Sequence, residues 1–139
     1  MSNMRLYLLC SHFNQDYAIP IGQIVEVVNR AKFTSLPKDR DDLLGLMNLR
    51  GDVVPIVNLS RTIQSDDIHK GQYVVICEIG DRKFGFPIEE ARQVAELDAR
   101  NFQSASGVVG AIDSNLVEYL SIQNDKTVLV LELERIIRQ

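Results

Sequence analysis

The sequence predicts an all-β protein built from two similar small barrels, and three observations favour this fold class. Valine and isoleucine supply 27 of the 139 residues and occur in short runs, which turn-forming residues interrupt about every 8–12 positions. Two segments have the pattern of a β-hairpin. The two halves of the chain also share one order of motifs. Closing each short sheet into a barrel removes exposed strand edges, so two packed barrels are expected.

The first hairpin is expected at the start of the chain. Residues 6–10 form an apolar run, residues 11–16 form a polar loop, and residues 17–21 return with bulky side chains at alternate positions. This alternation predicts two antiparallel strands with one buried face.

A strand is predicted next, from Ile24 to Val28, because β-branched residues dominate this run, although helical spacing is also satisfied. One helical turn is predicted over residues 39–44. Apolar strands are expected to begin at Val53 in the first half and at Thr127 in the second. Helical spacing within residues 133–137 predicts a short C-terminal helix.

The hairpin in the middle of the chain has the clearest pattern. Residues 73–77 lead into Gly80 and Asp81, and residues 83–86 return. A glycine followed by a short polar residue is typical of two-residue hairpin loops. The sequence therefore predicts a tight turn at these two positions.

The two halves match each other after a shift along the chain. A shift of 67 positions places Cys10 on Cys77 and residues 17–21 on residues 84–88, which share the order aromatic, small, apolar, Pro, Ile. A shift of 74 positions aligns residues 53–63 with residues 127–137. Two related barrels are therefore expected to follow one plan.

A single domain, residues 1–139, is expected to hold both barrels. Each half has about 70 residues, which is marginal for independent folding, so the halves are expected to share an apolar seam that is also a natural groove. Cys10 and Cys77 lie in apolar runs and lack the spacing of a redox or zinc motif. Two buried, reduced thiols are expected.

The charge balance argues against two classes of partner. Lysine and arginine number 15 against 19 acidic residues, a net charge of -4, so neither nucleic acid nor an anionic membrane surface is expected to bind. No apolar run approaches the roughly 20 residues that span a bilayer, so no membrane insertion is expected. The apolar run near the N-terminus is too short for a signal peptide, which predicts a cytoplasmic location.

The residues predict no catalytic site, metal site or cofactor. His12 and His69 fall in predicted loops without metal-ligand spacing. The glycines form neither a phosphate-binding loop nor a dinucleotide fingerprint. A small β-barrel enzyme or ligand-binding protein would need a deep polar pocket with a clustered acid or base, which the sequence does not indicate.

Function is expected where one half has residues that the other lacks, because the two halves share a scaffold. Residues 46–52 differ from their counterparts, residues 120–126. Gly51 permits a tight turn, which would present Arg50 at the tip of that turn. The alternative is that these residues form a plain surface turn without a role in binding.

The second difference is Glu26, whose counterpart is Gln93. In a strand, Glu26 shares one face with Ile24 and Val28, and the two intervening valines share the other. A carboxylate on an apolar face needs a partner, and Arg50 is the obvious candidate.

Two roles remain open for a pair of Glu26 and Arg50. The pair either holds the turn, a contact worth ~0–1 kcal/mol if exposed, or fixes the register of a partner protein. In the second case Ile24 and Val28 would form an apolar docking strip beside the pair.

The segment Asn48-Leu49-Arg50-Gly51, followed by an apolar run around Pro55, resembles the hallmark of the CheW family, the adaptor proteins of bacterial chemosensory arrays. The resemblance covers nearly the whole chain. Its other matching segments are residues 17–28, 74–86 and 128–137.

This resemblance implies two intertwined SH3-like five-stranded barrels with short helical turns, and no catalysis or cofactor. It implies an adaptor between the cytoplasmic tips of methyl-accepting chemoreceptors and the regulatory domain of a CheA-type histidine kinase, recruited to membrane-associated receptor arrays. The alternative is a CheW-like binding module of another pathway, such as surface or twitching motility, biofilm control or polar localisation. The candidate partner-binding residues are Ile24, Glu26, Val28, Asn48, Leu49, Arg50 and Gly51.

Overall fold

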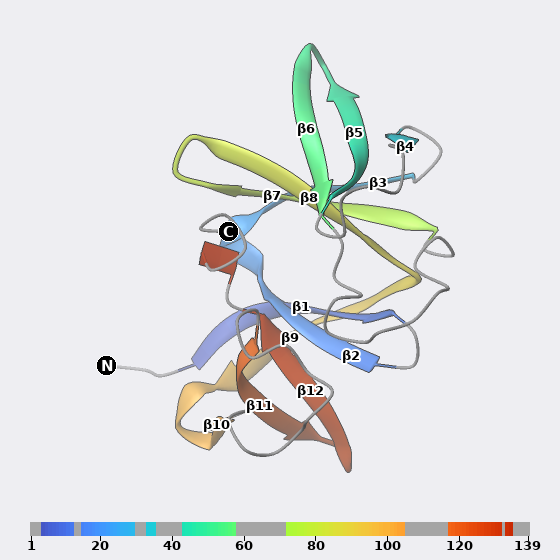
Figure 1. Cartoon of the computed structure of the whole chain (residues 1–139). Helices are drawn as coiled ribbons and strands as arrows, with labels where there is room; N and C mark the ends of the chain where they lie inside the picture. The colour runs from blue at the N-terminus through green and yellow to red at the C-terminus, as the bar shows by residue number, and fades with distance from the viewer. Residues whose placement is uncertain are drawn as a thin grey trace.

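The computed structural model describes residues 4–12, 15–29, 33–35, 43–57, 72–104, 117–131 and 133–134, and nearly all of them lie in β-strands (Figure 1). The predicted all-β fold class is confirmed. The strands form two six-stranded sheets, one below the other in Figure 1. Each sheet has five longer strands, consistent with two small five-stranded barrels, and one further strand of two or three residues.

The lower sheet has the order β10-β11-β12-β2-β1-β9. Its strands are β1 (Met4–His12), β2 (Gln15–Pro20), β9 (Glu90–Asp98), β10 (Gln103–Ser104), β11 (Val117–Gln123) and β12 (Lys126–Leu131). A 3-10 turn, η5 (Ala99–Asn101), links β9 to β10.

The upper sheet has the order β3-β7-β8-β6-β5-β4. Its strands are β3 (Ile24–Asn29), β4 (Phe33–Ser35), β5 (Leu43–Leu49), β6 (Asp52–Val57), β7 (Tyr73–Ile79) and β8 (Arg82–Ile88). The 3-10 turn η1 (Ile21–Gln23) carries the chain from β2 in the lower sheet to β3 in the upper one.

The duplication seen in the sequence is also present in the strand pairing. Cys10 lies opposite Tyr17 in the hairpin β1–β2, and Cys77 lies opposite Phe84 in the hairpin β7–β8, as the shift of 67 positions requires. Adding 74 to the bounds of β5 and β6 gives the bounds of β11 and β12. Under these shifts the five longer strands of the two sheets also have the same order.

Each barrel contains strands from both halves of the chain. The hairpin β1–β2 comes from the first half but pairs with β9 and β12 of the second. The hairpin β7–β8 comes from the second half and pairs with β3 and β6 of the first. The two barrels are therefore intertwined by an exchange of hairpins.

Among the described residues, three apolar clusters hold this arrangement together. One lies between the sheets, and its buried residues include Cys10, Tyr17, Cys77, Phe84 and Phe86. The other two belong to one sheet each: Val28, Met47, Leu49, Val54 and Ile76 are members in the upper barrel, and Tyr7, Ala18, Leu97, Val128 and Val130 in the lower barrel. The seam expected between the halves is thus a packed core, and both cysteines are buried there as free thiols.

The first hairpin departs from the sequence prediction in the length of its loop. Ser11 and His12 belong to β1, where they lie opposite Asp16 and Gln15. The loop predicted over residues 11–16 is therefore too long, and placing His12 in a loop was wrong. Ser11 pairs with β9 as well as with β2, so pairing on both sides keeps a polar residue in the strand. His69 lies outside the described residues.

The helical turn predicted over residues 39–44 is wrong where the structure describes it. Leu43 and Leu44 belong to β5, and Leu44 is buried in the core of the upper barrel. Strand pairing with β6 overrides the helical spacing of this short window. Residues 39–42 lie outside the described part. Leu133 and Glu134 have helical backbone, as expected for the start of the C-terminal helix, and residues 135–139 are likewise outside it.

Candidate functional site

The candidate site is built on the tight turn between β5 and β6. Leu49 lies opposite Asp52, which leaves Arg50 and Gly51 as a two-residue loop. Both loop residues have positive φ, +50° for Arg50 and +94° for Gly51. Two successive positive φ angles are the signature of a type I′ turn, whose twist matches that of the flanking strands. The turn predicted at Gly51 is confirmed.

Asn48 and Leu49 hold this turn in place. The side-chain oxygen Oδ1 of Asn48 accepts a hydrogen bond of 2.9 Å from the backbone N–H of Gly51. Leu49 is buried in the core of the upper barrel, so it anchors the last residue before the turn. Both residues are therefore explained by the shape of the hairpin.

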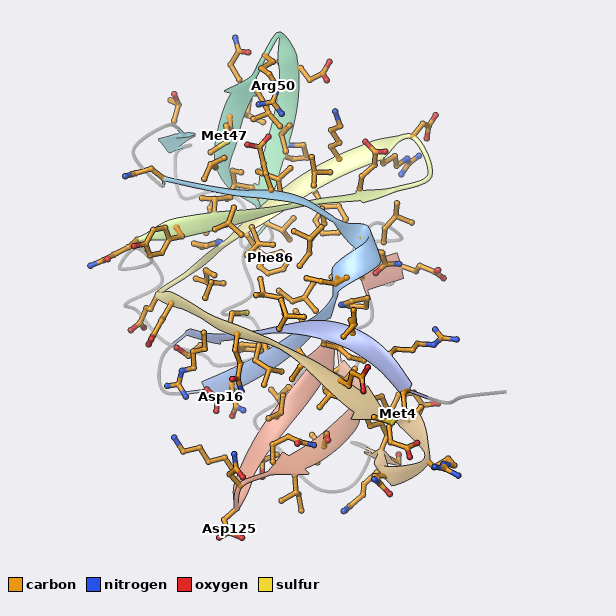
Figure 2. All side chains as sticks on the ribbon, turned by 180° about the vertical axis from the view of Figure 1, so that it is seen from behind. Met4, Asp16, Met47, Arg50, Phe86 and Asp125 are labelled. Carbon is orange, nitrogen blue, oxygen red and sulfur yellow. The ribbon has the colours of Figure 1, made fainter. Side chains whose placement is uncertain are left out.

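Arg50 and Glu26 form the ion pair that the sequence predicted. The Nη2 group of Arg50 donates a hydrogen bond to Oε1 of Glu26, which lies on β3. The Arg50 side chain is 70% exposed and the Glu26 side chain is 29% exposed. The hydrogen bond to Glu26 raises the pKa of the Arg50 guanidinium above its ordinary value. Arg50 is thus a permanently charged, exposed group with a fixed position (Figure 2).

A second ion pair, which sequence reasoning missed, lies beside the first. Asp52 follows the turn directly, and its Oδ2 lies 3.3 Å from Nζ of Lys83 on β8. The charge of Asp52 also acts on Arg50. Lys83 is brought here by the parallel pairing of β6 with β8, which joins segments of different halves. No local pattern in the sequence places Lys83 beside Asp52.

The structure corrects the apolar docking strip expected at Ile24 and Val28. Side chains of β3 alternate as predicted, but Val28 is buried in the upper core and Ile24 packs partly buried against the core between the sheets. These two residues face inward, because this face of β3 packs against the core between the sheets and the core of the upper barrel. The exposed apolar residues of β3 are instead Val25 and Val27, at 42% and 39% exposure.

Further apolar side chains reach the surface of the same sheet. Val53, the second residue of β6, is 68% exposed, and Leu46 on β5 is partly exposed. The upper sheet thus combines an anchored charge at one hairpin tip with several solvent-facing aliphatic residues. Such a mixture is typical of a protein-binding surface.

The described residues give little support to other kinds of site. They contain no group of three or more His, Cys, Asp or Glu side chains that could hold a metal ion. Over the same residues, no helix has the length and apolar character needed to cross a lipid bilayer. An open hollow of about 360 Å³ lies beside Ser11, Tyr73 and the adjacent Glu89 and Glu90, and it does not include the ion pair of Arg50.

Comparison with known proteins identifies the family of this fold. The family model of the CheW-like domain matches residues 6–139, which is nearly the whole chain. The chain belongs to the CheW-like domain family. The anchored Arg50 turn therefore lies in a CheW-like domain, in agreement with the resemblance of residues 48–51.

Several curated relatives carry chemotaxis names. The chemotaxis protein CheW of Helicobacter pylori is 26% identical over 128 residues, covering 91% of this chain and 77% of that protein. The CheW protein of Thermotoga maritima is 29% identical and covers 78% of each chain. The chemotaxis protein CheV3 of Helicobacter pylori is 26% identical over 87% of this chain, which spans only 40% of that longer protein.

A solved structure supports the fold independently. The crystal structure of the scaffolding protein TtCheW from Thermoanaerobacter tengcongensis has a TM-score of 0.80 to this chain, covering 93% of this chain and 84% of that one, at 23% identity. This CheW-like chain therefore shares the two-barrel architecture of a known scaffolding protein.

Proposed function

We propose that this chain is a non-catalytic scaffold of a bacterial chemosensory array, joining the cytoplasmic tips of methyl-accepting chemoreceptors to the regulatory domain of a CheA-type histidine kinase. The observation that carries the proposal is the CheW-like match over residues 6–139. The names of the relatives, chemotaxis proteins and a scaffolding protein, support the same role. The scaffold would act in the cytoplasm, at receptor arrays.

The site proposed to contact a partner is the surface around Arg50. Glu26 fixes the guanidinium at a tight turn, so a partner meets a charge whose side-chain freedom is already restricted. Preorganisation of this kind lowers the entropic cost of association. Asn48, Leu49 and Gly51 would contribute by keeping the turn in shape. Ile24 and Val28 would contribute by supporting β3, with Val25 and Val27 as its exposed contacts.

Coupling in such a scaffold would come from simultaneous binding. If one surface holds a receptor tip and another holds the kinase, any receptor state that favours one geometry also biases the kinase. Individual interfaces of this type are of modest area, and a lattice of many contacts supplies the stability.

The test is a pulldown of cognate kinase and receptor tip with Arg50→Glu. Reversing this charge places a carboxylate next to Glu26, so both the anchored cation and its position are lost. We expect assembly to weaken at least about tenfold, which corresponds to ~1.4 kcal/mol.

Arg100→Glu is the matched control. Arg100 lies in the lower sheet's connection η5, is 72% exposed, and also pairs with a carboxylate, that of Asp98. It therefore carries the same charge change at similar exposure, and assembly should be unchanged. Undiminished assembly by a folded Arg50→Glu protein would contradict the proposed contact surface.

Recovery of the full-length chain from its native cell tests the pathway separately. Co-purification of a CheA-type kinase together with chemoreceptors is the expected result. Recovery with the machinery of surface motility or polar localisation, and without receptors, would overturn the chemoreceptor assignment.

A further inference from the structure

The pseudo-symmetry of the fold creates a second version of the Arg50 site in the lower barrel. The shift of 67 positions places Glu26 on Gln93, and the shift of 74 places Arg50 on Asn124. The strand pairing agrees with the first shift. Glu26 lies opposite Ile76, and Gln93 lies opposite Leu9, which is the counterpart of Ile76. The ion pair of the upper barrel is therefore replaced by two amides at the corresponding position.

The two barrels differ in how their ends are filled. In the upper barrel the end is packed with Leu49 and Val28, both buried. Their counterparts in the lower barrel are Gln123 and Ala95, which are polar or smaller. A cavity of about 200 Å³ is present there, and Leu9, Ala95, Gln123 and Val128 are among the residues that line it.

The charges at the two ends also differ. In the upper barrel Asp52 and Lys83 form an ion pair across the end. In the lower barrel the two charges are exchanged: Lys126 takes the position of Asp52, and Asp16 takes the position of Lys83. Both residues line the cavity. The Asp16 carboxylate instead lies 3.6 Å from Nη1 of Arg92, the extra residue of the bulge in β9.

Both cations at the cavity retain donors for a ligand. Arg92 lies 3.6 Å from Asp16 and 3.7 Å from Glu90, distances too long for hydrogen bonds. Lys126 forms no ion pair with any described residue. The lining holds one carboxylate, Asp16, and the Glu90 carboxylate lies beside Arg92 outside it, so Lys126, which has no carboxylate paired with it among the described residues, is the charge that most favours an anion.

We propose that this end of the lower barrel binds a carboxylate carried on a short apolar stem. The side chains of Leu9, Ala95 and Val128 supply an apolar floor, while Arg92 and Lys126 supply charge-assisted donors for the carboxylate. The volume equals roughly six or seven water-sized groups, so it suits a short acid better than a cofactor. A free organic acid and a glutamate side chain of a partner share this chemistry.

The site is separate from the Arg50 surface. Arg50 lies at the tip of β5–β6, while Asp125, the neighbour of Asn124 in the β11–β12 turn, lies at the opposite end of the molecule (Figure 2). Loss of one function should therefore leave the other intact.

The test is a titration of the full chain followed by NMR of the Gln93, Gln123 and Asn124 side-chain amides. One arm uses pentanoate, the second a short peptide with blocked ends and one internal glutamate, and the third neutral pentanamide. We expect saturable shifts with at least one of the two carboxylates, at roughly millimolar concentration, and none with pentanamide. A response to pentanoate alone assigns a free acid, and a response to the peptide alone assigns a partner's side chain.

Variants that copy residues of the upper barrel make the test specific. Ala95→Val and Gln123→Leu introduce the side chains that fill the upper end and should abolish the shifts. Lys126→Gln should weaken binding about two- to fivefold, and Asp16→Asn should strengthen it by a similar factor. Asp81→Asn, in the exposed turn between β7 and β8 of the upper barrel, makes the same carboxylate-to-amide change away from both sites; it is the control and should leave the shifts unchanged.

Thermal melting confirms that each variant is folded, and Ala95→Val serves alone if Gln123→Leu does not fold. The proposal is overturned if folded wild type shows no shift with either carboxylate, if pentanamide shifts the same amides equally, or if both folded filling variants bind as wild type does.

Discussion

Gly51 shows how a single backbone angle fixes the candidate site. Its φ of +94° is unfavourable for any residue with a Cβ, although no atom lies within 4 Å of where that Cβ would be. Gly51→Ala should therefore lower the free energy of unfolding by about 1 kcal/mol through backbone strain alone.

Chemical denaturation measures this loss, and Gly22→Ala is the control. Gly22 has the same open surroundings but lacks a positive φ, so its substitution should leave stability almost unchanged. Equal effects of the two substitutions would contradict the strain argument and assign the loss to the added methyl group.

A second residue-scale prediction concerns Asp98, which caps η5. The side chain and backbone N–H of Arg100 donate to the Asp98 carboxylate and lower the pKa of that carboxyl below its ordinary value. Because the pKa of Asp98 is lower in the folded than in the unfolded protein, the contact stabilises the fold at pH values above the ordinary pKa of the carboxyl group. This stabilisation is lost as the pH falls through the lowered pKa. NMR titration of Arg100→Gln should show the Asp98 pKa moving back upward. An unmoved pKa would show that the side-chain contact does not persist in solution.

At the scale of elements, Gly85 on β8 is required by close packing rather than by a turn. A Cβ at this position would lie 2.9 Å from Cγ1 of Val74 and 3.1 Å from Cδ1 of Ile56. The corresponding position in β2 is Ala18, which is buried without such conflict against the smaller core of the lower barrel. The two hairpins are thus fitted to different cores.

Gly85→Ala should therefore destabilise the protein by about 1–3 kcal/mol, the usual cost of overpacking a core. Urea unfolding measures the change. Ala18→Gly, the reciprocal substitution, should cost less, about 1 kcal/mol, because it removes one methyl group and adds backbone freedom. A Gly85→Ala protein as stable as wild type would show that the neighbouring side chains can move aside.

Local patterns and the comparison of the two halves predicted several elements and contacts of the structure. The strand at Ile24, the turn at Gly80 and the pairing of Glu26 with Arg50 follow from alternation, turn chemistry and the comparison of the halves. Alternation alone does not say which face of β3 is buried, since that depends on the strands that cover it. For this reason the strip at Ile24 and Val28 was assigned to the wrong side.

Long-range pairing explains the other differences. The parallel contacts of β6 with β8 and of β12 with β2 join distant segments, so no local window contains the Asp52–Lys83 ion pair or the exchange of hairpins. Leu44 is a different case, because the antiparallel pairing of β5 with β6 and burial in the upper core make it part of a strand despite its helical spacing. The duplication was the only signal in the sequence that extended over these distances.

At the scale of the whole molecule, the two thiols report on the core between the barrels. Burial raises the pKa of Cys77 to about 12 and that of Cys10 still further. The native thiols therefore remain protonated at pH values where an unfolded chain releases its thiol protons, starting near the ordinary value of 9.0. The stabilisation that comes from keeping the thiols protonated in the folded state is complete at pH values below the ordinary thiol pKa. It is lost as the pH rises toward 12.

Two measurements check this prediction. A thiol reagent at pH 8 should react with neither cysteine in the native protein and with both after denaturation. Between pH 9 and pH 11 the unfolding free energy of wild type should fall more steeply than that of Cys77→Ala. Rapid reaction of the native thiols would mean that the seam opens far more often than its packing implies.

We expect the exchange of hairpins to make the molecule one folding unit. A fragment ending within residues 58–71 keeps β1 and β2 but loses β9 and β12, the neighbours of that hairpin on both sides. It also keeps β3 and β6 without β7 and β8, which lie between them in the upper sheet. Neither half can complete a barrel, and the core between the sheets needs residues from both.

Two separately produced halves should therefore be unfolded alone, with no dispersed amide signals, and should regain the native spectrum when mixed. The intact chain should unfold in one transition, with the same midpoint for probes in the upper and lower barrels. A first half that folds by itself, or two transitions assigned to separate barrels, would mean that the hairpins need not be exchanged for a barrel to form.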